Sequence, residues 1–79
     1  MTDREILPYF ASYVKVKLHG KYDMLSQEAF DEIKKYTPDI TKEIYMEIIN
    51  NYNRLSNRFF NVVEKIEDEF FFGVISFDD

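Results

Sequence analysis

The pattern of hydrophobic and polar positions begins with a short helix. TDRE, residues 2–5, matches a capping box, in which a threonine caps the first turn and a glutamate three residues later caps the threonine backbone. Pro8 lacks the amide hydrogen that a continuing helix needs, and its ring clashes with the preceding turn. The helix is therefore predicted to end or kink near Leu7.

The next segment, YVKVKLH at residues 13–19, alternates apolar and polar side chains. A period of two with β-branched valines favours a strand. His19-Gly20 suits the two-residue turn of a hairpin, whose second strand would cover about Lys21 to Leu25. A helix is the competing interpretation, because three apolar residues are also spaced by four: Phe10, Val14 and Leu18. The strand is the preferred interpretation.

A second helix is predicted to begin after Ser26, a favourable cap, with Glu28 in its first turn and Lys34-Lys35 near its end. Its apolar stripe consists of Ala29, Phe30, Ile33 and Tyr36. Thr37-Pro38-Asp39 ends this helix, since proline forbids continuation and favours the start of another.

Residues 40–68 contain no glycine or proline and carry a helical apolar stripe: Tyr45, Ile48, Tyr52, Leu55, Phe59, Val62 and Ile66. One helix of this length would span about 44 Å, whereas a compact chain of this size has a radius of gyration of about 12 Å. Two alternatives stay open. The helix breaks within NNYNRLSN, residues 50–57, where asparagine and serine are weak helix formers, or it protrudes and is covered by a second chain.

The chain ends on EDEFFFGVISFDD, residues 67–79, its most apolar segment between acidic flanks. On a strand, one side would carry Phe71, Ile75 and Phe77, and the other would carry Phe70, Phe72 and Val74. A strand apolar on both sides is typical of a buried position in a sheet. A small domain has too little helix surface to cover both sides, so we expect a homodimer or an apolar face ready for a partner. The acidic flanks would limit aggregation.

Together these elements predict a single domain over residues 1–79 with an α+β fold: a short N-terminal helix, a β-hairpin, two or three helices and a C-terminal strand. The alternative is an all-α bundle in which the hairpin region is helical.

Charge narrows the choice of partner. The net charge is −5, and residues 64–79 hold six acidic residues against one lysine. Phosphate binding needs a net basic surface, so general nucleic-acid binding is not expected. An acidic surface suits a basic protein.

Catalytic and metal-binding chemistry finds little support. The chain has no cysteine, one histidine and two glycines, too few for a zinc site, a disulfide or a phosphate-binding loop. Glu43 and Glu47 lie four residues apart, and we interpret them as a solvated helix face. We therefore predict no enzyme activity, metal or cofactor. No signal sequence and no apolar run of about 20 residues are present, so we expect a cytoplasmic protein without a membrane span.

The predicted function is a small acidic protein-binding module, acting as an inhibitor or accessory factor on a larger protein, such as a nucleic-acid-binding one. Its predicted partner-binding residues are Glu67, Asp68, Glu69, Phe70, Phe72, Val74 and Phe77. One alternative is a single-stranded nucleic-acid binder that uses basic and aromatic residues of the 13–22 stretch: Tyr13, Lys15, Lys17, Lys21 and Tyr22. Another is a structural homodimer with no separate ligand.

Overall fold

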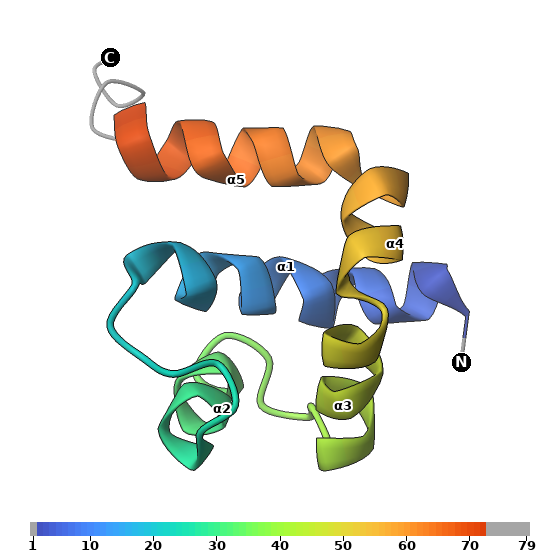
Figure 1. Ribbon diagram of the computed structural model, residues 1–79, viewed down its shortest axis with the longest axis vertical. Coiled ribbons are helices and arrows are strands. Elements are labelled where there is room, and N and C mark those ends of the chain that lie inside the picture. Colours follow the sequence, from blue (N-terminus) through green and yellow to red (C-terminus); the bar gives the residue numbers. More distant parts are fainter. Residues whose placement is uncertain (1, 73–79) are drawn as a thin grey trace.

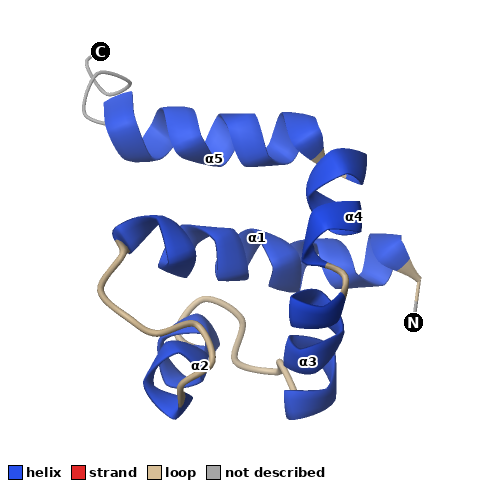
Figure 2. Cartoon of the chain, viewed as in Figure 1, coloured by secondary structure: helices blue, strands red, loops and turns tan. Residues whose placement is uncertain are grey.

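The computed structural model describes residues 2–72, with the side chain of residue 72 left aside, and every regular element in this range is a helix (Figures 1 and 2). The helices are α1 (Asp3–His19), α2 (Gln27–Lys34), α3 (Lys42–Asn50), α4 (Tyr52–Arg58) and α5 (Phe60–Phe72). The predicted α+β fold is wrong, and the all-α alternative fits these residues.

Helix α1 lies at the centre of the arrangement (Figure 1). Helix α5 lies beside α1 and runs in the same direction, while α2 and α3 pack on the other side of α1. Helix α4 joins α3 to the start of α5. The long central helix thus contributes to the core on both of its flanks.

The N-terminal cap of α1 is as predicted. The Thr2 amide donates to Glu5 Oε1 at 2.9 Å, and the Glu5 amide donates to Thr2 Oγ1 at 3.3 Å. These are the two reciprocal bonds of a capping box. They satisfy amides that the first turn of a helix otherwise leaves without partners.

Helix α1 continues through Pro8 to His19. Of the predicted end or kink near Leu7, the end is therefore wrong, and so is the predicted strand over residues 13–19. Proline inside a helix costs about 3 kcal/mol. Continuation buries Phe10 and Val14, which are four residues apart and at most 2% exposed. Burying each such side chain contributes roughly 1.5–3 kcal/mol, so packing outweighs the proline. The spacing of four, rather than the alternation, was the informative pattern.

The predicted hairpin turn at His19-Gly20 is instead the C-terminal cap of α1. Gly20 has φ of 69° and its amide donates to the Lys17 carbonyl oxygen at 3.1 Å. A helix cap and a type I′ turn both need a positive φ, which glycine adopts without strain. The glycine therefore indicated the backbone conformation correctly but did not distinguish the two kinds of element.

The prediction for the second helix is confirmed at its start, where Ser26 Oγ accepts from the Ala29 amide at 3.2 Å. Three residues of the predicted stripe are buried in the core: Ala29, Phe30 and Ile33. Tyr36 is not, since 45% of it is exposed.

The stretch from residue 40 to 68 breaks twice. The first break, at Asn51, lies inside the segment predicted to break, and Asn51 Nδ2 donates to the Glu47 carbonyl oxygen at 2.9 Å. The same carbonyl also accepts from the Asn51 backbone amide at 3.1 Å, so the side chain adds a second hydrogen bond at the end of α3. The second break, at Phe59, was not predicted. The two breaks give a compact radius of gyration of 12.6 Å.

Aromatic rings fill much of the core where α1 meets α3, α4 and α5. The Phe10 ring lies 5.9 Å from Tyr52 and 6.1 Å from Phe59, between ring centroids. The Tyr13 ring lies 5.9 Å from Tyr45 and 5.6 Å from Tyr52. Tilted pairs of this kind are favourable beyond their buried area.

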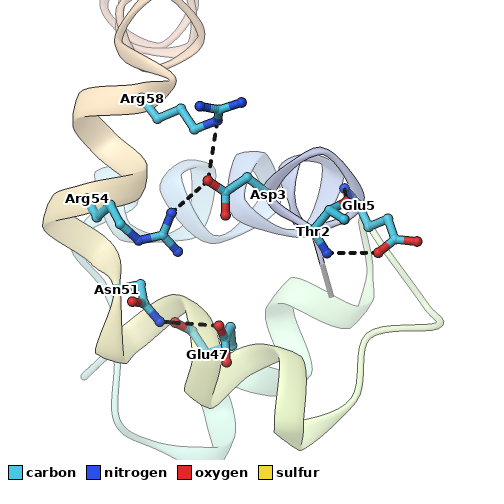
Figure 3. A network of polar contacts seen from close by, with 7 residues as sticks. All are labelled: Thr2, Asp3, Glu5, Glu47, Asn51, Arg54 and Arg58. Carbon is cyan, nitrogen blue, oxygen red and sulfur yellow. Dashed lines mark hydrogen bonds and ion pairs between the residues drawn. The ribbon is translucent and has the colours of Figure 1, made fainter.

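An ion-pair cluster fastens the start of α1 to α4 (Figure 3). The Asp3 carboxylate accepts from Arg54 Nη1 at 2.6 Å and lies 3.3 Å from Arg58 Nε. The hydrogen bond from Arg54 is the main cause that holds the pKa of Asp3 below its ordinary value, and the nearby Arg58 charge adds to it. Two of the chain's arginines are thereby engaged in structure.

The predicted C-terminal strand is wrong where the structure describes it, because Phe70, Phe71 and the backbone of Phe72 belong to α5. Val74 and Phe77, with the rest of residues 73–79, lie outside the described residues. The expectation of a strand that is apolar on both sides therefore does not apply to residues 70–72.

Candidate protein-binding surface

Helix α5 has an inner and an outer face. Ile66, on the inner face, is 7% exposed, whereas Phe60 and Phe71 are 57% and 66% exposed. Eleven residues make about three helical turns, so the two phenylalanines project from the same side. Ile66 lies well over 90° around the helix from both, at about 100° per residue. Figure 1 shows α5 along the edge of the molecule, beside α1.

Carboxylates occupy the outer face between the two phenylalanines. Glu64 lies one turn after Phe60, and Asp68 lies about one turn before Phe71; both are exposed. We use "outer face of α5" for these four residues. Glu67, half-buried, and exposed Glu69 add further negative charge, and Lys65 is the helix's only basic residue.

The acidic residues of α5 form no ion pair with another residue of the 2–72 range. The ion pairs found among residues 2–72 join Asp3 to Arg54 and Arg58, and Glu32 to Lys35; the carboxylates of α5 take part in none of them. A helix face with uncompensated negative charge and exposed aromatic rings is an unusual combination, since exposed apolar side chains normally occur singly.

A groove of about 170 Å³ lies where the C-terminal ends of α1 and α5 meet. Lys15, Leu18 and His19 form one side of it, and Glu69 and Phe70 form the other. Tyr36 also lines it. The rings of His19 and Phe70 meet edge to face at 5.4 Å between centroids. We call this the terminal groove.

The predicted partner-binding residues are only partly gathered here. Asp68 and Glu69 are exposed, Glu67 is half-buried, and Phe70 is 42% exposed beside the terminal groove. Their role in binding stays a prediction.

The sequence interpretation missed Phe60, Glu64 and Phe71 as one surface. A spacing of four and then seven residues is a helical signal, so it was visible once α5 was taken as a helix.

The residues of the predicted nucleic-acid stretch do not share one face. Tyr13 is 5% exposed, and burial, with the nearby Tyr45 and Tyr52, raises its pKa to about 12. Lys15 Nζ lies 5.5 Å from the ring centroid of Tyr36, which follows α2. Lys17 Nζ lies 5.4 Å from the ring centroid of Tyr52, in α4.

The last two residues of that stretch follow the end of α1. Lys21 is exposed, and the Tyr22 hydroxyl donates to Glu32 Oε1 at 3.3 Å. The nucleic-acid alternative assumed that residues 13–19 form a strand, on which alternate side chains share one side. These residues are helical instead. The expectation that the protein does not bind oligonucleotides stays a prediction.

Glu43 and Glu47 lie along α3 beside a shallow hollow of about 260 Å³, whose described lining also includes Thr41 and Ile44. All four residues belong to α3 and its cap. Glu47 Oε2 accepts from Asn51 Nδ2 at 3.4 Å, so this carboxylate supports the end of the helix (Figure 3). Among residues 2–72, no three aspartate, glutamate or histidine side chains converge as metal ligands would.

Comparisons with protein-family models, curated proteins and solved structures find no match for this chain. Within residues 2–72, no helix combines the length and the apolar character that crossing a membrane requires.

Proposed function

We propose that the protein is a non-catalytic module that binds a basic segment of another protein on the outer face of α5. The observation that carries this proposal is the alignment of two exposed phenylalanines with two exposed carboxylates between them on one helix face. Such a face offers both apolar anchor points and electrostatic attraction.

The phenylalanines supply the apolar part of the argument. Burying a phenylalanine contributes roughly 1.5–3 kcal/mol, and small domains have only about 5 kcal/mol of stability in total. Phe60 and Phe71, which are more than half exposed, lack more than half of that contribution in the free chain. A partner that covers both would recover it as binding energy, and aromatic residues are common among those that dominate interfaces.

The carboxylates favour a basic partner over a second copy of this chain. A two-fold interface brings the same patch of both subunits together. Pairing two outer faces would place Glu64 and Asp68 against the same carboxylates of the other copy, and like charges in contact are costly. Lysine and arginine side chains on a different protein would instead meet opposite charge.

Basic surfaces of this kind are typical of proteins that bind nucleic acids. A module that covers such a surface with carboxylates competes with phosphate for the same side chains. We therefore propose that the protein acts as an inhibitor or accessory factor of a nucleic-acid-binding protein.

Affinity capture with matched charge variants tests the proposal. The immobilised full chain is compared with Glu64→Gln/Asp68→Asn and with Glu28→Gln/Glu43→Gln, which removes the same charge from exposed positions on α2 and α3. We expect the immobilised wild type and the Glu28→Gln/Glu43→Gln control to retain a basic protein that the Glu64→Gln/Asp68→Asn variant does not retain. About 1 M salt should release it, because screening then acts within about 3 Å.

Light scattering on the same proteins supplies the opposing outcome. If the outer face joins two copies of this chain, removing its charges will strengthen self-association. A Glu64→Gln/Asp68→Asn protein that dimerises more tightly than the wild type would overturn the proposal. Equal retention of the partner by the wild type and by this variant would also overturn it.

A further inference from the structure

The outer face of α5 constrains the backbone of whatever binds it. Inside a helix, amides and carbonyls bond to each other, so this face offers a partner side chains but no free backbone groups. An extended segment lying on it would bury its own peptide groups without hydrogen-bond partners, at about 1–3 kcal/mol for each group. A helical segment satisfies its own backbone and avoids this cost.

The spacing of the anchors sets the register of such a helix. Phe60 and Phe71 are eleven residues apart, or about 16 Å along the axis. A partner helix that crosses α5 at a shallow angle of about 20° stays in contact over that length. Its apolar residues would then also lie eleven residues apart, on one side of the helix.

The carboxylates of α5 determine which side chains of the partner lie between its apolar anchors. Glu64 and Asp68 each lie about one turn inward from a phenylalanine. Lysine or arginine residues one turn inside each apolar anchor of the partner would therefore reach them, and their long side chains can extend along the contact.

We infer that the outer face of α5 binds an amphipathic basic α-helix, with two apolar anchors about three turns apart and lysine or arginine between them. This inference rests on the proposed function, in which the partner is basic, and it adds the partner's conformation and periodicity.

Three synthetic peptides of equal length and equal charge test the inference against the full chain. Each has about 20 alanine-rich residues, because shorter isolated helices are marginal. The first carries two leucines eleven residues apart with lysines between them. The second places the leucines nine residues apart, on opposite sides of a helix. The third keeps the first spacing but has a central proline that prevents helix formation.

Binding is measured by fluorescence anisotropy at about 0.15 M salt and again at tenfold lower salt. We expect the first peptide to bind at least about fivefold more tightly than the other two, which corresponds to the loss of one interface anchor. Phe60→Ala and Phe71→Ala should each weaken binding of the first peptide by a similar factor. Met46→Ala, which changes a 48% exposed apolar residue on α3, should leave binding unchanged.

The outcomes separate the two proposals. If all three peptides bind equally and Glu64→Gln/Asp68→Asn weakens them all, the helical inference is wrong and the basic partner stands. If none of the peptides binds at low salt, both proposals are wrong. If Phe60→Ala and Phe71→Ala leave binding of the first peptide unchanged, the inference is also overturned.

Discussion

Helices α1 and α5 lie side by side and use their aromatic residues in opposite ways (Figure 1). In α1, Phe10 and Tyr13 are at most 5% exposed and contact rings from α3, α4 and the Phe59 break. In α5, Phe60 and Phe71 are more than half exposed. The comparison shows that one helix holds the fold together while its neighbour presents a surface.

The charged residues of α1 and α5 also differ in whether they contact the rest of the domain. Lys15 and Lys17 of α1 lie over tyrosine rings of the same molecule, whereas the carboxylates of α5 lack partners in the ion pairs found in residues 2–72. The two lysines of α1 therefore contribute to the packing of the domain, whereas no ion pair within the described part of the chain involves the carboxylates of α5.

The largest expected effect separates the two helices directly. Phe10→Ala should lower the free energy of unfolding by about 3–5 kcal/mol, because it leaves a cavity among buried rings. Phe60→Ala and Phe71→Ala should each change it by less than about 0.5 kcal/mol. Urea unfolding followed by circular dichroism measures all three. Equal losses in both helices would mean that the phenylalanines of α5 also belong to the core.

A second test uses the largely buried side chain of Tyr13 in α1. The pKa of Tyr13 is about 12, above its ordinary value of 10.0, so the folded state favours the protonated form. That contribution is complete below pH 10.0 and declines as the pH rises towards 12. Unfolding at alkaline pH should show a loss on the order of 1–2 kcal/mol, reduced in Tyr13→Phe. An unchanged pH profile in Tyr13→Phe would mean that the hydroxyl is not held in the core.

The end of α1 provides a third test. Gly20 has a positive φ, and a methyl group added to its Cα would meet no atom within 4 Å, so Gly20→Ala costs backbone strain alone. We expect a loss of about 1 kcal/mol in thermal or urea unfolding. Gly20→Asn should lose less, since asparagine tolerates this conformation. Stabilisation by alanine would show that α1 does not end in a left-handed cap.

The smallest effect concerns the start of α1. Because Arg54 lowers the pKa of Asp3, the ionised form is favoured in the folded state. This contribution is present above the ordinary value of 3.8 and is lost as the pH falls below it. The stability of Asp3→Asn should therefore fall less steeply with acid than that of the wild type. Parallel acid profiles of the two proteins would contradict a role for the cluster in Figure 3.

Local signals in the sequence were sufficient where they involve neighbouring residues. The Thr2 and Ser26 caps, the positive φ of Gly20 and the break near Asn51 could all be read from residue types, since each depends on bonds or strain within a single turn. The acidic character of residues 64–79 was equally plain from the sequence.

Tertiary packing decided the rest. YVKVKLH has the alternation of a strand, yet α1 extends through it. As a helix, Phe10, Val14 and their neighbours bury apolar surface against α3 and α5, and the free energy gained exceeds the cost of Pro8 inside the helix. The candidate site depended on the same decision. Only when residues 60–71 are helical do Phe60 and Phe71 fall on one side, with Glu64 and Asp68 between them. The sequence supplied the rings and the charges, and the helix packed on α1 determined which of them face outward.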